Sequence, residues 1–201
     1  MITTFLLASI ALTLSPGPDI LYVLSQSISN GKKFGIVTAA GLVTGILVHT
    51  TLIALGVSAI IKQSELLFTV IKMVGACYLL WIAYQVYKAP ASIDLKSNIN
   101  NKKSLLSLFK QGFVMNVLNP KVTLFFLAFF PGFVDEKSEN VTQQIYFLGF
   151  LFMLQAFVIF SLICFLADKL TVFLRNNKHF AVFLKWFQIV VFIFITVLIL
   201  I

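Results

Sequence analysis

Six long apolar runs, separated by short polar segments, account for most of the 201 residues. These runs cover residues 2–24, 34–61, 66–87, 111–130, 141–167 and 180–201. A helix needs about 20 consecutive apolar residues to cross the hydrocarbon core of a bilayer. The pattern therefore predicts an all-α integral membrane protein, with six transmembrane helices forming a single domain over residues 1–201.

Two of the six runs contain residues that an unbroken membrane helix does not carry. The first run is interrupted at Ser15-Pro16-Gly17-Pro18-Asp19, and the fourth is interrupted at Asn119-Pro120-Lys121. Proline has no N–H, so Pro16 leaves the carbonyl of Leu12 without its helical donor, and Pro18 does the same to Leu14. At membrane depth, such groups must face protein or water. Helices 1 and 4 are therefore predicted to be Pro-broken.

A polar linker over residues 88–110, rich in Ser, Asn and Lys, divides the chain into halves of three runs each, 1–87 and 111–201. With the first half starting outside and the second inside, the two would form inverted three-helix repeats. Pro18-Asp19 then corresponds to Pro120-Lys121, and Ile71-Lys72 corresponds to Leu184-Lys185. Paired broken helices at corresponding positions of two such halves indicate the binding site of a secondary transporter.

Composition and charge agree with a membrane protein. Hydrophobic residues make up 60% of the chain and the mean hydropathy is +1.01. The net charge of +8 comes from residues between the apolar runs, which favours membrane-flanking anchors over nucleic-acid binding. The loops after the first, third and fifth runs hold most of the basic residues, whereas those after the second and fourth hold Lys62 and Lys137. This asymmetry predicts that both termini are extracytoplasmic. The start, which lacks a basic segment and a cleavage site, is not expected to be a signal peptide.

The two breaks supply the chemistry that we expect of the site. A broken helix exposes carbonyls on one side and N–H groups on the other, so two facing breaks suit a zwitterion such as an amino acid. Asp19 and Lys121, the only charges deep in the apolar runs, should approach each other near the midplane. Asp19 would exchange protons or bind a substrate ammonium, and Lys121 would restrain it or bind a carboxylate; the alternative is a static ion pair. Neutral hydrogen-bonding candidates beside the breaks are Thr13, Ser15, Asn116 and Asn119.

Other polar and small residues in the runs have alternative interpretations. His49 would be either a hydrogen-bonded packing residue or a proton relay. Gly41, Gly45 and Gly75 would allow close helix packing, with a dimer face or space for a moving helix as alternatives. Cys77 and Cys164 lack metal-ligand spacing, so no metal and no cofactor are expected.

Four motifs, in this order, carry a family resemblance. They are Ser15-Pro16-Gly17-Pro18-Asp19, Gly41-x-x-x-Gly45, Gly75-Ala76-x-Tyr78-Leu79 and Asn119-Pro120-Lys121. Over essentially its whole length the chain resembles amino-acid exporters of the LysE/RhtB type. The resemblance implies a protein of the bacterial inner membrane that exports amino acids by exchange with protons. One departure is the sixth run, which usually carries small residues in such proteins but has no glycine over residues 186–192. Its bulk could narrow the pathway, shift the substrate preference or remove a packing face.

The sequence thus predicts a secondary transporter that exports amino acids or close analogues by alternating access. The alternatives are a divalent-cation exporter, a membrane-embedded enzyme and a non-transporting accessory subunit. An enzyme is not expected, because no Ser/His/Asp set, no HExxH motif and no paired acids occur in the runs. The expected partners are an amino-acid substrate, protons and the lipid bilayer, with a possible homodimer and no nucleic acid.

Overall fold

The computed structural model describes residues 2–63, 65–90, 104–135, 140–167, 169 and 178–200. The described residues form helices α1 (Ile2–Leu14), α2 (Pro18–Asn30), α3 (Lys32–Gln63), α4 (Glu65–Lys88), α5 (Leu105–Val117), α6 (Pro120–Leu124), η1 (Phe125–Phe129), η2 (Phe130–Phe133), α7 (Val141–Phe165) and α9 (Lys178–Leu200). Four of these helices are long and apolar enough to cross a membrane, or up to six if each of two bent pairs is one span. The predicted all-helical membrane class is confirmed.

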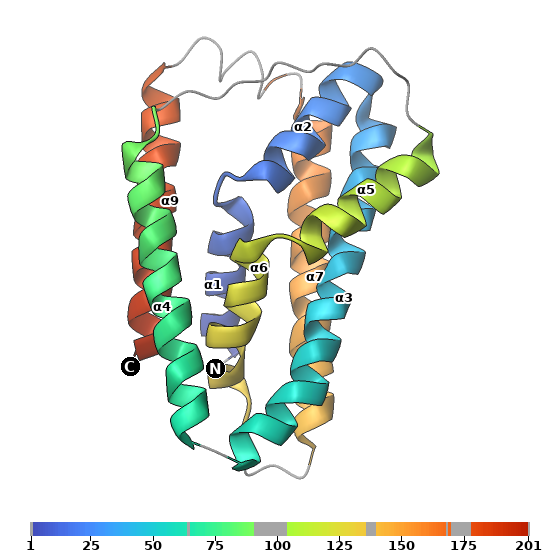
Figure 1. Ribbon diagram of the computed structural model, residues 1–201. Coiled ribbons are helices and arrows are strands. Elements are labelled where there is room, and N and C mark those ends of the chain that lie inside the picture. The colour runs from blue at the N-terminus through green and yellow to red at the C-terminus, as the bar shows by residue number, and fades with distance from the viewer. Residues whose placement is uncertain are drawn as a thin grey trace.

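The two predicted breaks are present, and both lie near mid-height in Figure 1. Helices α1 and α2 meet at 58°, and α5 meets the helical segment Pro120–Phe133 at 47°. In the first break, residues 15–17, Gly17 is extended (φ −166°, ψ −179°) and Pro18 starts the next helix. In the second break, residues 118–119, Asn119 is extended and Pro120 starts α6. Proline suits the first turn of a helix, where its missing N–H leaves no bond unmade.

Helix α5 begins inside the segment that the sequence marks as linker. Ser104 caps it, because the Ser104 hydroxyl accepts a hydrogen bond from the N–H of Ser107 at 3.2 Å. Serine is a favoured N-cap because its oxygen satisfies one of the free N–H groups of the first turn. Residues 91–103 of the predicted linker lie outside the described residues, as do the loop positions of Lys137 and Arg175.

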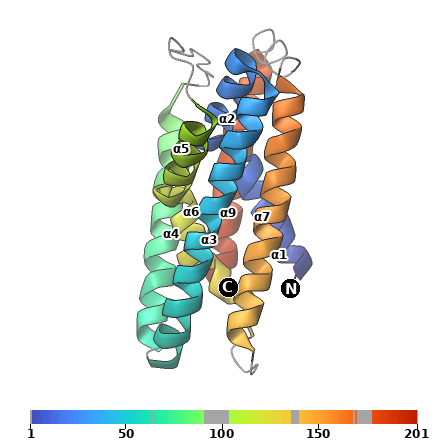
Figure 2. The same ribbon diagram turned by 90° about the vertical axis from the view of Figure 1, so that its right-hand side faces the viewer.

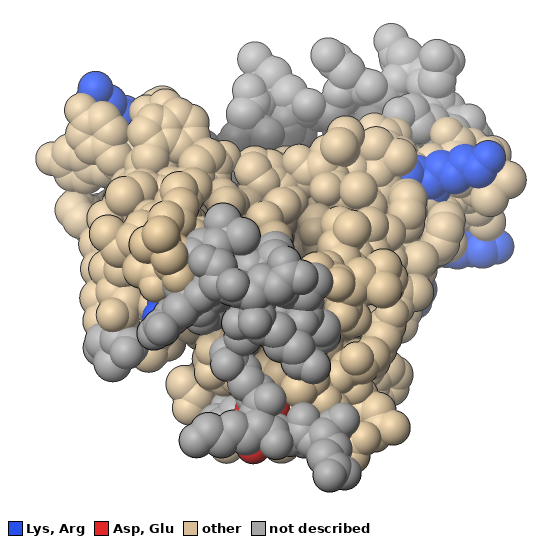
Figure 3. All heavy atoms as spheres, turned by 60° about the horizontal axis from the view of Figure 1, so that its bottom comes forward, with Lys and Arg blue, Asp and Glu red and all other residues tan. Residues whose placement is uncertain are grey.

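Two pairs of helices, one member from each predicted half, lie against each other and run in opposite directions. Helix α3 packs along α7, and α4 packs along α9. In Figure 1, α3 descends while α7 ascends, and α4 ascends while α9 descends. Both described chain ends lie in the lower part of the molecule, above the lower ends of α3, α4 and α7, and the view in Figure 2 agrees. With that lower end turned forward, the described surface is largely uncharged and the visible basic side chains lie towards its margins (Figure 3).

Glycines allow α3 and α5 to approach closely. A Cβ at Gly41 would collide with the backbone carbonyl of Phe109, and one at Gly112 would collide with that of Thr38. A Cβ at Gly45 would lie 2.8 Å from Oδ1 of Asn116. Small residues let membrane helices pack backbone to backbone. The close approach fixes α5, and with it the second break, against α3.

Phenylalanine rings fill the interior below the breaks. The ring of Phe5 meets that of Phe130 edge-on at 5.4 Å between centroids, and the rings of Phe126 and Phe130 stack at 4.8 Å. Phe125 and Phe152 join them, and all five side chains are buried. These five residues form the phenylalanine cluster, which connects α1, α7 and the segment after α6. The apolar tract over residues 125–130 therefore serves mainly as core, although Leu127 points outward.

Candidate functional site

Asp19 lies in the first turn of α2, directly after the first break, and is 4% exposed. A helix N-terminus carries partial positive charge, which favours a carboxylate there. Oδ2 of Asp19 accepts a hydrogen bond from Nδ2 of Asn119 at 2.6 Å. Oδ1 has no hydrogen-bond partner among the described residues. One oxygen of the carboxylate is thus hydrogen-bonded to the protein, and the other has no described hydrogen-bond partner.

Asn119 joins the two breaks through one side-chain amide. Its Oδ1 accepts a hydrogen bond from the N–H of Lys121 at 3.0 Å, which caps α6. Its Nδ2 donates to Asp19 in the other break. Because one rigid amide group makes both contacts, the start of α6 sets the position of the Asp19 carboxylate.

Lys121 makes the reciprocal connection from α6 to the first break. Its Nζ donates to the carbonyls of Leu12 and Ser15, each at 3.2 Å. The Leu12 carbonyl is the one that loses its helical donor to Pro16, so the ammonium replaces the missing N–H. A Cβ at Gly17 would lie 3.4 Å from Nζ, so glycine leaves space for the ammonium.

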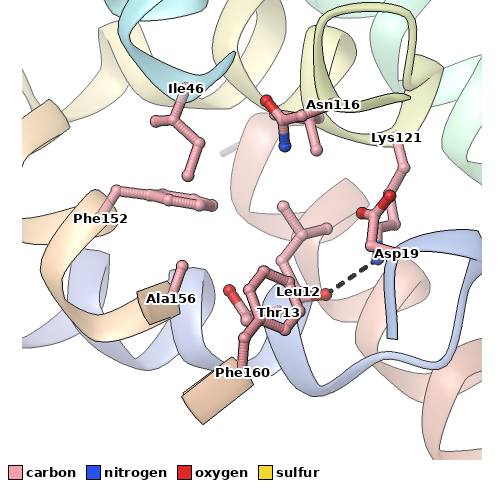
Figure 4. A pocket seen from close by; sticks show the side chains of 10 residues that line it. Leu12, Thr13, Asp19, Ile46, Asn116, Lys121, Phe152, Ala156 and Phe160 are labelled. Carbon is pink, nitrogen blue, oxygen red and sulfur yellow. Dashed lines mark hydrogen bonds between the residues drawn. The ribbon is translucent and has the colours of Figure 1, made fainter. Parts of the chain in front are cut away.

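Asp19 and Lys121 come together as the sequence suggests, but not as partners in a hydrogen bond. Both line one pocket and lie on the same side of it (Figure 4). The carboxylate accepts its one described hydrogen bond from Asn119, and the ammonium donates to two backbone carbonyls. Each charge therefore has hydrogen-bond support of its own.

This pocket, called the break pocket below, lies where α1, α2, α3, α5, α6 and α7 meet. Its lining residues are Leu12, Thr13, Asp19, Ile46, Asn116, Lys121, Val122, Phe152, Ala156 and Phe160. The space between atoms amounts to about 280 Å³, including the part that is open to the surroundings. Water-sized solutes have little room there, about enough for a single molecule.

Several buried polar atoms near the breaks lack a partner among the described residues. They are Oδ1 of Asp19, Oδ1 of Asn116, the hydroxyls of Ser15 and Tyr22, and Oε1 of Gln155. Buried polar atoms in proteins are nearly always hydrogen-bonded, and an unpaired one costs about 1–3 kcal/mol. The two that line the break pocket, on Asp19 and Asn116, are both acceptors and suit a donor such as an ammonium group.

His49 lies behind the second break and does not line the pocket. Its Nε2 is 3.2 Å from the carbonyl oxygen of Asn116, which also accepts from the N–H of Asn119 at 2.9 Å because Pro120 has no N–H to donate. Because a carbonyl can only accept, Nε2 carries the hydrogen in this contact. The ring lies beside Phe126, with 5.5 Å between the two ring centroids. His49 thus supports the second break much as Lys121 supports the first.

A polar contact also ties α7 to the end of α1. Nε2 of Gln155 donates to the Thr13 hydroxyl at 3.0 Å, and that hydroxyl donates to the carbonyl of Ser9 at 2.8 Å. Although Thr13 lines the break pocket, its hydroxyl is therefore already engaged as donor and acceptor.

The sequence did not single out the apolar wall of the pocket. Ile46 on α3 and Phe152, Ala156 and Phe160 on α7 look like ordinary core residues in apolar runs, and no local pattern distinguishes them. The predicted candidates Pro16, Gly17, Pro18 and Pro120 shape the breaks without lining the pocket, and Gly75 packs against Ala128 in η1.

Helix α9, which has the glycine-free stretch, contributes no described residue to the pocket. It packs mainly on α4 instead. The bulk of that stretch therefore does not narrow the break pocket. Within the described part of the chain, no group of three or more His, Cys, Asp or Glu residues could hold a metal ion.

Comparison with known proteins agrees with this architecture. The family model described as "LysE type translocator" matches residues 10–201. The homoserine/homoserine lactone efflux protein of Salmonella typhimurium (strain LT2) is 30% identical over 175 residues, which cover 87% of this chain and 84% of that protein. Its counterpart from Salmonella typhi is 29% identical over the same shares.

A third relative, named uncharacterized membrane protein YrhP, of Bacillus subtilis (strain 168), is 31% identical over 178 residues, 85% of this chain and 84% of that protein. No solved structure matches. The family match spans nearly the whole chain and includes both breaks and every residue that lines the pocket. The chain therefore belongs to the LysE-type translocators, a family of membrane transporters.

Proposed function

We propose that this protein exports amino acids or close analogues from the cytoplasm across a bacterial inner membrane, in exchange for protons. The observation that carries the proposal is the break pocket, where two broken helices hold a carboxylate and an ammonium, each with its own backbone or amide support. The relatives named as homoserine/homoserine lactone efflux proteins support the same class of solute.

The pocket offers a matching group for each charge of a zwitterion. A substrate ammonium would donate to Oδ1 of Asp19 and Oδ1 of Asn116, both buried acceptors without a described partner. A substrate carboxylate would accept from Nζ of Lys121, which has two described acceptors and three hydrogens. Carboxylate and ammonium lie on the same side of the pocket, so both ends of one small backbone could bind together.

The proposed exchange with protons is supported by Oδ1 of Asp19, which has no hydrogen-bond partner among the described residues. A proton on this carboxylate and a substrate ammonium beside it would compete, because each neutralises the same buried charge. The carrier would then release the substrate when it takes up a proton on one side, and the reverse on the other. Among the described residues that line the pocket, Asp19 is the acid that could bind and release this proton.

Alternating access is supported by the small free volume and by the arrangement of the halves. An amino acid is several times larger than water, so the pocket must widen before it binds one. We propose residues 1–87 and 111–201 as inverted repeats that rock against each other. The opposite directions of α3 and α7, and of α4 and α9, support this assignment.

Counterflow in inside-out membrane vesicles tests the proposal. Wild-type vesicles should accumulate labelled amino acids when a proton gradient is imposed, and Asp19→Asn should reduce this by roughly 100-fold. That reduction follows from the 2–5 kcal/mol that truncating one partner of a buried charged contact costs. Asp135→Asn, which changes an exposed acid near η2, is the matched control and should transport normally. Gradient-driven transport that survives in Asp19→Asn would remove this carboxylate from the exchange.

A further inference from the structure

We propose that the break pocket selects amino acids with an uncharged, apolar side chain, and that Ala156 sets the length of the side chain it accepts. This inference rests on the proposed function and names the substrate class of the same site. It comes from the distribution of lining residues around the pocket, which is polar on one side and apolar on the other.

The two sides are visible in Figure 4. Asp19 and Lys121 lie together at one side, and Ile46, Phe152 and Ala156 lie at the opposite side. The apolar side chains are all buried. A zwitterion whose two charges bind at the polar side must extend its side chain towards this apolar wall, where dispersion and desolvation favour apolar atoms.

A charged side chain would find no opposite charge at that wall. Asp19 and Lys121 are the charged residues among the described lining residues, and both would be engaged by the backbone charges of the substrate. The Thr13 hydroxyl, which also lines the pocket, is already bonded to Gln155 and Ser9. An extra carboxylate or ammonium there would be buried without a counter-ion among the described lining residues, although the neutral Oε1 of Gln155 lies near Thr13, and a buried charge without an opposite charge is unfavourable.

The spacing of residues on α7 identifies the position that limits length. Phe152, Ala156 and Phe160 follow one another at four-residue intervals, so they form a single stripe on the helix. Ala156 is the small member between two rings. The gap between the rings is therefore the place where a substrate side chain fits, and a larger residue at 156 would fill it.

Purified protein reconstituted in liposomes provides the test, with counterflow measured for labelled alanine, leucine, methionine, lysine and glutamate. Wild-type protein should prefer leucine and methionine over lysine and glutamate by about tenfold or more, the lower range of what pocket contacts discriminate. Ala156→Leu should reduce leucine and methionine counterflow by a similar factor while preserving alanine. Val158→Leu, a similar change at a half-exposed position on the same helix, should leave the profile unchanged.

A second pair of variants separates charge from polarity. Ala156→Asp should raise lysine counterflow relative to leucine by about tenfold, because it supplies a counter-ion at the wall, and Ala156→Asn should not. If Ala156→Asp does not fold, the Ala156→Leu variant tests the inference: unchanged leucine and methionine counterflow in that variant would contradict it. Wild-type transport of lysine or glutamate as fast as leucine would overturn the inference while leaving amino-acid export intact. If no amino acid moves at all, the proposed function itself fails, and this inference fails with it.

Discussion

Asn119 performs two tasks at the residue scale, and they can be separated. Its Oδ1 caps α6 and its Nδ2 holds Asp19. The cap stabilises the start of α6, whereas the contact with Asp19 positions the carboxylate, whose other oxygen has no described partner. A substitution that removes both should therefore differ from one that keeps the cap alone.

Asn119→Ala should lower the free energy of unfolding by about 1 kcal/mol through the lost cap, and should also abolish gradient-driven transport. Asn119→Ser should recover most of the stability, because serine is an equally good cap, but its hydroxyl is too short to replace the amide on Asp19. Thermal unfolding in detergent and vesicle counterflow measure the two effects. Normal transport by the serine variant would show that the contact with Asp19 is dispensable.

The sequence identifies the breaks at this scale but not their connections. Prolines and a glycine in an apolar run mark a break through local geometry alone, and both were found. The contact from Asn119 to Asp19 joins residues 100 positions apart, and no local preference encodes it. The predicted approach of Asp19 to Lys121 is correct in location, but the freed carbonyl of Leu12 competes successfully for the ammonium.

At the scale of elements, the crossing of α3 and α5 depends on backbone contact. Gly41 faces the carbonyl of Phe109, a backbone atom that cannot move aside without displacing α5. Gly56 lies on the same helix, with nothing within 4 Å of the position where its Cβ would be. The two glycines therefore form a matched pair for testing the crossing.

Gly41→Ala should lower the free energy of unfolding by about 1–3 kcal/mol, the usual cost of overpacking. Gly56→Ala should leave it unchanged or raise it by up to about 1 kcal/mol, because alanine favours helix. Thermal unfolding of the purified variants in detergent compares them. Equal stabilities for the two variants would contradict the close crossing.

The segment after α6 shows where element-level prediction stops. The aromatic tract predicts an apolar helix that faces core or lipid, and most of it is core. The structure makes residues Phe125–Phe129 a π-helix, in which the N–H of Phe130 reaches the carbonyl of Phe125. Such wide turns are rare overall but frequent near functional sites, and this one contributes Phe125 and Phe126 to the phenylalanine cluster.

At the scale of the whole molecule, the described chain ends and two described basic residues lie towards opposite ends. Both described ends lie in the lower part of Figure 1, and Lys32 and Lys88 lie towards the upper end, at the start of α3 and the end of α4. By the positive-inside rule we propose that the upper end faces the cytoplasm, which would make both termini extracytoplasmic. Under the proposed function, this orientation would also set the direction in which the pocket opens to release its solute.

Reporter fusions test this topology. Alkaline phosphatase fused to the C-terminus should be active, and green fluorescent protein at the same place should be dark, because the former needs an extracytoplasmic position to fold. Fusions after Lys88, truncated there, should give the reverse pattern. A fluorescent C-terminal fusion would invert the assignment.

The number and order of the predicted spans follow from hydropathy, because a run of about 20 apolar residues is long enough to cross the hydrocarbon core of a bilayer. Which helices touch does not follow, because in lipid every apolar face is equally acceptable and small local packing differences decide. For this reason α3 against α5, and the stripe of α7 that walls the pocket, emerge only with the structure.

The attachment of the Lys121 ammonium to main-chain carbonyls has an electrical consequence. Since the described hydrogen bonds of this cation go to main-chain carbonyls, we expect it to stay in place whether the acid is bare, protonated or bound to a zwitterion. Under the proposed exchange, the site is neutral with Asp19 bare or zwitterion-loaded, and it bears one positive charge when proton-loaded. Each cycle would then carry one charge inward, so a voltage of 100 mV would contribute about 2.3 kcal/mol to expulsion of the solute.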